Sequence, residues 1–212
     1  MRQMYWNRYD DWYPSRKERR RKRDCRIPRC DFERTDDKCV AVVERAAAFV
    51  RQTPGDIGET ESRFYKLSKA MQVALPIVEL AEQMNNGGFL AYFHNEACWF
   101  TAYAVQGLER IGAAAHLEAL RRARRVFPDG KVPRNNLRRA AMLPECDIDW
   151  WKSLKPCDMM RERLFMPRVD WEILKRLRKA DIAWRQADQQ EGPLLERYGL
   201  RFVMKNLDAF VC

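Results

Sequence analysis

The sequence has no apolar run long enough to cross a membrane. A spanning helix needs about 20 consecutive apolar residues, whereas the longest apolar stretches here are interrupted at Glu79, Glu82 or Glu109. Residues 1–13 mix aromatic and charged side chains and lack the continuous apolar segment of a secretory signal. We therefore expect a protein of the cytoplasm that neither spans a membrane nor is exported by this route.

Residues suited to catalysis are also scarce. His94 and His116 are the two histidines, and neither stands at a recognised spacing from a carboxylate, serine or cysteine that it could activate. Glu145, Asp147 and Asp149 form an acidic cluster, but no second carboxylate motif accompanies them. A solvated loop explains this cluster better than a metal site. We expect no enzymatic activity, no catalytic residues and no cofactor.

The seven cysteines do not show the close paired spacing of zinc modules. Cys25, Cys30 and Cys39 would need a fourth ligand, and Cys146 and Cys157 are no better placed. An odd number of cysteines in a chain of this length is typical of reduced thiols in a cytoplasm. The sequence therefore predicts neither a structural metal nor a disulfide framework.

Glycine and proline are too few for a low-complexity chain, at 9 and 10 of 212 residues, and 46% of the residues are hydrophobic. The apolar residues recur at helical spacing, and nothing argues for a sheet. We expect an all-α fold, with one multi-helix domain over residues 35–212. A basic, aromatic-rich arm over residues 1–34 precedes it.

The arm concentrates positive charge. Residues 1–39 hold 13 Lys and Arg against 8 Asp and Glu, and seven of the eight residues 16–23 are basic. Such a run repels itself and buries nothing, so we expect it to be disordered until a partner binds. Its aromatic residues have the spacing of one helix face, which suits docking or stacking: Tyr5, Trp6, Tyr9, Trp12 and Tyr13.

Capping residues and apolar stripes predict the helices of the domain. The first begins at Thr35, carries Cys39, Val42, Val43, Ala46 and Val50 on one face, and ends at Thr53-Pro54-Gly55. The second runs from about Thr60 with Phe64, Leu67, Met71 and Leu75 on one face. Pro76 either kinks this helix or opens a new one to Met84.

Further helices are expected over residues 89–94, 96–111 and 113–127, the last with Leu117, Leu120 and Phe127 inside. Pro128-Asp129-Gly130 forms a turn after them. Residues 131–168 are read as irregular with short helices, with Trp150 and Trp151 packed on the domain. A long helix carries Val169, Ile173, Leu177, Ala180 and Trp184, and a last one follows Gly192-Pro193 through Leu195, Tyr198, Phe202 and Phe210.

Between these helices lies a motif with its own physical logic, Asn85-Asn86-Gly87-Gly88-Phe89. Two glycines can adopt positive φ, reverse the chain and let another helix approach closely. Asparagine can satisfy loose backbone groups there, at Asn85 or Asn95. We expect Phe89, Tyr92 and Phe93 to enter the core, which makes the motif structural; a ligand pocket around the loop is the alternative.

The segment Met84 to Asn95 resembles the signature of the bacterial DNA-mimic protein family, a family of DMP-type helical domains of generally unknown function. Leu108 to Ala113, with Leu120, Ala123 and Phe127, is similar to the same family pattern, although Ala91 stands where the family commonly has glutamine. The resemblance extends over Phe64 to Phe210. It implies an all-helical domain with no known catalytic role.

The best understood member of that family imitates DNA and occupies the DNA-binding face of a transcription factor. Such mimicry requires an acidic surface, whereas this chain has a net charge of +10. We therefore carry over the fold and not the mimicry. The leading expectation is a macromolecule-binding protein that regulates or contacts an unidentified protein partner through its helical domain; a homo-oligomer is a further option.

The alternative function is sequence-nonspecific nucleic-acid binding. It rests on two groups of basic residues. The arm contributes Arg16, Lys17, Arg19, Arg20, Arg21, Lys22 and Arg23, and a second basic face, from Arg121 to Arg139, is led by Arg121, Arg122, Arg124 and Arg125. No helix-turn-helix, RNA-binding or zinc-finger signature accompanies them.

Overall fold

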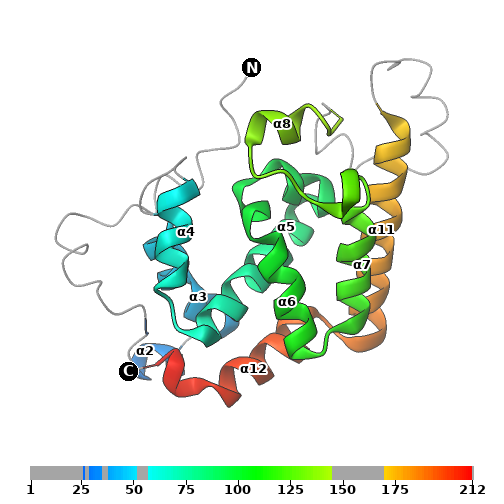
Figure 1. The fold of residues 1–212 in the computed structure, drawn as a ribbon. Helices are drawn as coiled ribbons and strands as arrows, with labels where there is room; N and C mark the ends of the chain where they lie inside the picture. Colours follow the sequence, from blue (N-terminus) through cyan, green and yellow to red (C-terminus); the bar gives the residue numbers. More distant parts are fainter. Residues whose placement is uncertain (1–25, 27–28, 35–37, 52–56, 145–169, 212) are drawn as a thin grey trace. The chain divides into compact units, whose positions relative to one another are not determined.

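The computed structural model describes residues 26, 29–34, 38–51, 57–144 and 170–211 (Figure 1). Every regular element within these residues is a helix, so the predicted all-α fold is confirmed. None of the described helices combines the length and the apolar character that spanning a bilayer requires. Apart from Arg26 and the short helix α2 (Arg29–Arg34), the predicted arm lies outside the described residues.

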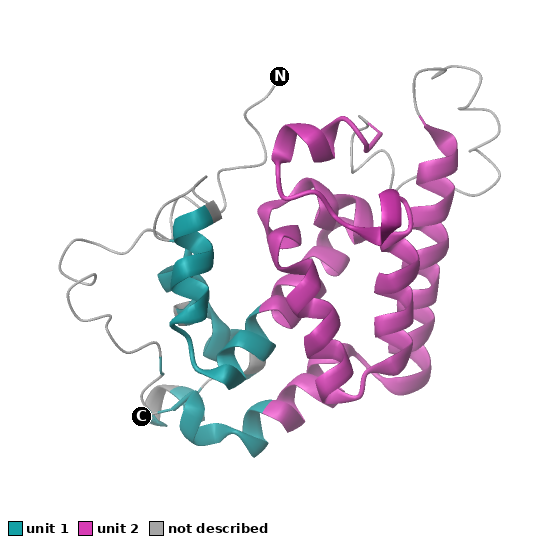
Figure 2. Ribbon diagram, viewed as in Figure 1, with its two compact units in different colours: residues 1–75, 203–212 teal, residues 76–202 magenta. Residues whose placement is uncertain are grey.

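The chain divides into two compact units (Figure 2): residues 1–75 with 203–212, and residues 76–202. Both boundaries fall inside helices. The first lies in α5 (Lys69–His94), and the second lies in α12 (Leu200–Lys205). The expectation that residues 35–212 behave as one domain stays a prediction.

The unit of residues 1–75 and 203–212 is built around α3 (Lys38–Val50), which packs against α2 and against α4 (Ile57–Tyr65). The predicted stripe of α3 is confirmed at Val42, Val43, Ala46 and Val50, all of which are buried. Apolar side chains at these positions recur every three or four residues, so one face of the helix leaves water.

The single helix predicted from Thr60 to Leu75 is wrong, because the chain breaks between α4 and α5. The Ser68 hydroxyl accepts a hydrogen bond from the Met71 N–H at 3.2 Å and so caps α5. The Gln72 amide donates to the carbonyl oxygens of Tyr65 (3.1 Å) and Leu67 (2.9 Å). Side-chain bonds thus satisfy the backbone groups that the break exposes. The four apolar residues of the predicted face are nevertheless buried.

Pro76 does not open a new helix. It lies inside α5, whose one departure from helical backbone angles is at Gly88 (φ 70°, ψ −162°). Proline removes one backbone hydrogen bond from a helix, but the residues beside it are buried, including Leu75, Ile77 and Val78. Their packing outweighs the lost bond, since burial supplies most of the stability of helices in proteins.

The unit of residues 76–202 contains the rest of α5, the 3₁₀ turn η2 (Glu96–Phe100), α6 (Thr101–Ile111), α7 (Ala114–Arg124), the turn η3 (Pro128–Gly130), α8 (Asn136–Ala140), α11 (Trp171–Glu191) and η4 (Leu195–Gly199). Gly112 ends α6 in the left-handed region (φ 78°), as the sequence indicated. α6 packs on α7, and α7 packs along α11 (Figure 1).

The predicted core of this unit is confirmed at Leu117, Leu120, Phe127, Leu177 and Trp184, all of which are buried. The predicted turn at Pro128-Asp129-Gly130 is also present. The helix predicted from Leu195 to Phe210 is instead a π-helical turn, α12 and a 3₁₀ turn η5 (Leu207–Ala209). Trp150 and Trp151 lie outside the described residues.

Candidate functional site

The inner face of α11 carries the polar centre of the unit of residues 76–202. Asp181, Trp184 and Asp188 are three and four positions apart, so their side chains leave the same side of the helix. Asp181 and Trp184 are buried. Together the three contact the glycine turn of α5, α7 and the segment after Gly192, so this one helix face connects these parts of the unit.

Asp181 holds the glycine turn. Its carboxylate oxygen Oδ1 accepts a hydrogen bond from the Phe89 N–H at 2.8 Å, inside the protein. Gly88 precedes this donor with φ 70°, and a Cβ atom placed on Gly88 would lie 2.6 Å from Oδ1. Glycine is therefore required at position 88 twice over, by the positive φ and by the close carboxylate.

The environment of Asp181 disfavours its charge. Burial raises the pKa of this carboxyl from 3.8 to about 6, although the Phe89 N–H, Arg185 and Arg178 act in the opposite direction. The two arginines flank Asp181 on α11 at four residues after it and three before it. The group titrates near neutral pH in the folded protein and accepts the Phe89 bond in either form, because a protonated carboxyl keeps a carbonyl oxygen.

Asp188 binds the one buried histidine of the unit's described part. His116 Nε2 lies 3.0 Å from Asp188 Oδ1, and the imidazole is fully buried. Its ring meets the edge of Trp184 at 4.8 Å between centroids and Tyr198 at 6.2 Å. Asp188 Oδ1 also accepts from the Leu194 N–H at 3.2 Å. The pair thus fastens α7 and the segment after Gly192 to α11.

The second ring nitrogen of His116, Nδ1, has no hydrogen-bond partner in the described part of the chain. Because the ring is enclosed, it cannot reach a substrate at the surface without local opening. A buried imidazole that is hydrogen-bonded and packed against aromatic rings has a structural role. His94, by contrast, ends α5 and is exposed, as expected for a helix-end residue.

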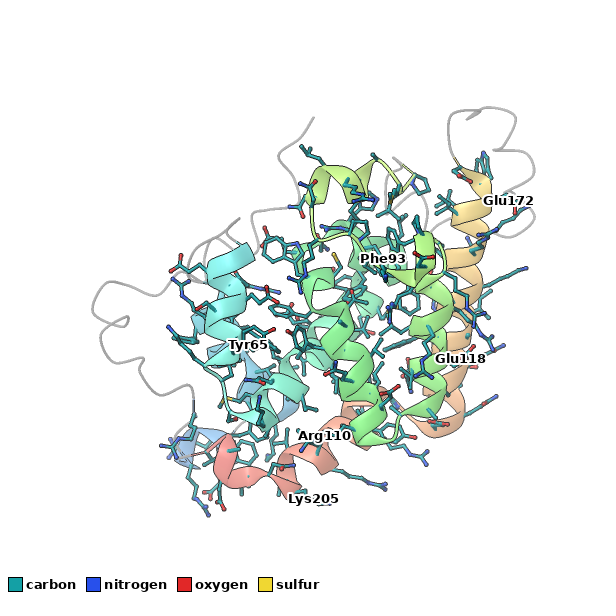
Figure 3. The ribbon with its side chains drawn as sticks, viewed as in Figure 1. Tyr65, Phe93, Arg110, Glu118, Glu172 and Lys205 are labelled. Atoms are coloured by element: carbon teal, nitrogen blue, oxygen red, sulfur yellow. The ribbon has the colours of Figure 1, made fainter. Side chains whose placement is uncertain are left out.

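The aromatic residues of the motif enter the core, as the sequence predicted. The Phe89 ring meets Trp184 edge to face at 5.8 Å, and Phe93 meets Phe127 at 5.0 Å. Phe93 points into the unit in Figure 3. The Tyr92 hydroxyl lies 3.2 Å from the Thr101 hydroxyl, and burial raises the pKa of Tyr92 above its usual range.

Cys98 is a free, buried thiol beside this cluster. Burial raises its pKa from 9.0 to about 12. It therefore stays protonated near neutral pH and is a poor nucleophile. Cys25, Cys146 and Cys157 lie outside the described residues, as do the side chains of Cys30 and Cys39, and Glu145, Asp147 and Asp149.

Arg139 is the largest fully buried side chain of the described residues. Its guanidinium donates to the carbonyl oxygens of Phe93 (2.6 Å), Pro133 (2.9 Å) and Arg134 (3.3 Å), and to Asn136 Oδ1 (2.8 Å). The planar fork of arginine suits such a divided set of acceptors. It fixes the loop before α8 to the end of α5. Counting Arg139 with an exposed basic face was therefore wrong.

The remaining motif residues divide between surface and interior. Asn85 and Asn86 are exposed and Gly87 is buried. The Asn95 amide donates to Gln83 Oε1 of α5. The structure therefore brings Gly88 and Phe89 against α11. Tyr92 and Phe93 contact Thr101 and Phe127 instead, whereas Asn85 and Asn86 are exposed.

Several of the arginines proposed for polyanion binding form ion pairs or hydrogen bonds within their own unit. Arg121 pairs with Glu109 of α6, and Arg122 Nε donates to Glu118 at 2.9 Å. Arg124 Nε donates to the Gly130 carbonyl at 2.9 Å. Arg125 is exposed. The arm residues, Arg16 to Arg23, lie outside the described residues.

Sequence reasoning missed Asp181, the His116–Asp188 pair and Arg139. A signal for the first two was present: Asp181 and Asp188 are seven residues apart on a stripe that is otherwise apolar. A carboxylate on the inner stripe of an amphipathic helix needs a hydrogen-bond partner. Arg139 gave no such signal, because it stands in a run with Arg134 and Arg138, which are exposed.

A family model described as DMP19-like protein matches residues 65–202. The chain belongs to the DMP19-like protein family. The match spans the whole unit of residues 76–202, and so it includes the turn at Gly88, the inner face of α11 and the buried Arg139. The resemblance inferred from the sequence is thus confirmed at the level of the DMP19-like family. No curated protein and no solved structure matches the chain.

Proposed function

We propose that the protein is a non-catalytic, cytoplasmic binding protein that recognises a protein partner through the helical unit of residues 76–202. The observation that carries this proposal is the use made of the unit's internal polar groups. Asp181, Asp188 and Arg139 each hold two segments of the unit together. These residues stabilise the unit from inside, as expected for a rigid scaffold whose exposed side chains bind another molecule.

Charge indicates the nature of the partner. The chain has a net charge of +10, and its described arginines and lysines are mostly exposed on helices. A surface of this sign attracts acidic macromolecules and repels basic ones. Imitation of DNA needs an acidic surface, and this chain has the opposite charge. Its partner is therefore proposed to be an acidic protein and not a DNA-binding protein.

Nucleic acid is the second candidate, supported by the seven basic residues between Arg16 and Arg23. Such binding would be electrostatic and blind to sequence, since this run has charge density without a motif that places side chains against base edges. Its affinity would fall with salt through counterion release, with a slope of about 0.9 per phosphate neutralised on duplex DNA.

One affinity purification separates the two candidates. The full chain and a full-length variant with Arg16 to Arg23 neutralised to glutamine at the seven basic positions are used as bait in native lysate, with and without nuclease. We expect a protein partner to be retained by both baits after nuclease treatment. Loss of all co-purifying material with nuclease would show that nucleic acid is the ligand and overturn the proposal. Loss of a nuclease-resistant protein with the neutralised arm would overturn the assignment of binding to residues 76–202.

A further inference from the structure

The outward side of α11 is an exposed and strongly basic helix face. Between Ile173 and Ala187 the helix carries five basic residues and one acidic residue, Asp181, which is buried. The basic residues lie at or near the surface: Lys175, Arg176, Arg178, Lys179 and Arg185. No hydrogen bond or ion pair joins Arg176 or Lys179 to another described residue, and Arg185 interacts with the buried Asp181.

The acidic residues that precede or follow this stretch already form hydrogen bonds or ion pairs with other residues of the chain. Glu172, at the first turn of α11 in Figure 3, accepts from the Lys175 ammonium at 3.0 Å. Asp188 binds His116, and Glu191 accepts from the Tyr198 hydroxyl at 2.6 Å. The positive charge in the middle of the face is therefore left for a partner to neutralise.

The geometry of this face suits another helix. The most outward residues follow one another at alternating steps of four and three: Lys175, Lys179, Ile182, Gln186 and Gln189, all of them exposed. Alternating steps of three and four form the straight seam along which two helices pack. At 1.5 Å per residue the seam is about 21 Å long, which matches a partner helix of about four turns.

One member of the seam decides between classes of partner. Ile182 is 47% exposed at its centre, between the two lysines and the two glutamines. An isoleucine gains nothing from a phosphate backbone, but it gains from an apolar side chain that covers it. Lysines on one side of Ile182 and Arg185 on the other surround an apolar centre. This pattern matches an acidic helix that carries an apolar residue among glutamates or aspartates.

Pairing with a second copy of the chain is disfavoured by charge. An antiparallel arrangement would place Ile182 against its own copy, as a two-fold axis requires. It would also bring together the five basic residues of each α11, and like charges across an interface are costly. A partner of opposite charge removes this repulsion.

We propose that the outward face of α11, from Lys175 to Gln189, is the docking surface for an acidic amphipathic helix of the partner protein. The proposal rests on the proposed function and specifies its surface and the chemistry of its partner. The lysines and arginines provide attraction and orientation, and Ile182 provides the apolar contact at the centre.

The test uses the full-length protein and a defined probe. The probe is a fluorescein-labelled helical peptide with leucine at the centre of a four-three line and glutamate at the other line positions. Binding is followed by fluorescence anisotropy at several salt concentrations, with a random-sequence DNA duplex as a second probe. We expect Lys175→Glu/Lys179→Glu to weaken peptide binding at least about tenfold. Ile182→Ser should weaken it about fivefold and leave duplex binding unchanged.

A matched control reverses two charges elsewhere in the same unit. Arg110→Glu/Arg201→Glu makes the same change in net charge at exposed positions of α6 and α12. It should alter peptide binding less than about twofold, and circular dichroism should show every variant folded. Binding of a peptide with serine in place of leucine should no longer depend on Ile182→Ser, because that peptide already lacks the side chain that contacts Ile182.

Three results would overturn the proposal: no binding of the peptide, equal loss with the control variant, or duplex binding that depends on Lys175 and Lys179 as strongly as peptide binding does. A dimer in sedimentation velocity that Ile182→Ser dissociates would assign the face to a second copy. If the purified partner still binds Lys175→Glu/Lys179→Glu, the docking surface is wrong while the proposed function stands.

Discussion

At the scale of single residues, the unit of residues 76–202 depends on a few buried polar groups whose partners are distant in sequence. Gly88 and Asp181 are one such combination, because the absent side chain of the first leaves room for the carboxylate of the second. His116 and Asp188 are another. A buried polar group that loses its partner costs more than the bond itself contributes, so these positions should be sensitive to small changes.

The glycine at position 88 permits a direct test. Replacing it with alanine forces a Cβ to within 2.6 Å of the Asp181 carboxylate and retains φ 70°. We expect Gly88→Ala to lower the free energy of unfolding by at least about 2 kcal/mol. Gly112→Ala is the control, since its φ is 78° but no atom lies within 4 Å of the added Cβ. It should cost about 1 kcal/mol from backbone strain alone. Equal losses in urea titrations would show that the carboxylate does not crowd position 88.

Asp181 should make stability fall as the pH rises. The pKa is raised from 3.8 to about 6, so between these values the folded protein keeps a proton that the unfolded chain has released. The stabilisation is complete below about pH 4 and is lost through pH 6, by about 3 kcal/mol at most. Asp181→Asn keeps an oxygen for the Phe89 N–H but does not titrate. The difference between the two stability curves should therefore change across this window; parallel curves from pH 4 to 8 would contradict the assignment.

At the scale of elements, short helices are positioned by side chains from outside them. α8 has five residues, too few to be stable alone. Asn135 caps it by accepting from the Arg138 N–H at 2.9 Å, and Arg139 attaches it to the carbonyl of Phe93. The position of α8 is thus set by one guanidinium more than by its own helical propensity.

Replacing that guanidinium should loosen α8 while the rest of the unit stays folded. Arg139→Lys keeps the charge but cannot reach four acceptors at once. We expect limited trypsin digestion to cleave after Lys131, Arg134 or Arg138 at least about fivefold faster than in the parent, because cleavage requires local opening. Arg138→Lys, at an exposed position that remains a trypsin site, is the matched variant and should leave the cleavage rate of the other sites unchanged.

The sequence predicted elements better where the signal was local. The apolar stripes of α3 and α7 and the stop at Gly112 depend on residues within one or two turns, and all were predicted correctly. The break before α5 was not, because it is stabilised by Ser68 and Gln72 binding backbone groups that helix periodicity does not report. The partners of Asp181 and Asp188 lie on other helices, at separations that no sequence pattern specifies.

At the scale of the whole molecule, the two compact units share helices: α5 begins in one and ends in the other, and α12 does the reverse. A helix that crosses a boundary couples the stability of both sides, since melting one half removes hydrogen bonds at the junction and exposes the neighbouring turn. One cooperative domain over residues 35–212 stays a prediction, and shared helices give it a physical basis that can be tested.

Cooperativity can be measured by perturbing one unit and observing the other. Phe64 is fully buried in the unit of residues 1–75 and 203–212, and Trp184 is buried in the unit of residues 76–202. Phe64→Ala should cost about 3 to 5 kcal/mol as a cavity in the core. If unfolding is two-state, the urea midpoint followed by tryptophan fluorescence should fall together with the midpoint followed by circular dichroism. A fluorescence transition that stays where it is in the parent would show that the units unfold separately.

The hydrogen bond between Phe89 and Asp181 spans 92 positions of the chain. Contacts this remote delay folding, because the intervening loop must be closed before the bond can form. α6 and α7 are adjacent in sequence and pack on each other, so we expect them to associate early, with α11 docking afterwards. Truncating Asp181 should then accelerate unfolding while leaving the refolding rate nearly unchanged. The lifetime of the native state, more than the speed of reaching it, would be set by this one carboxylate.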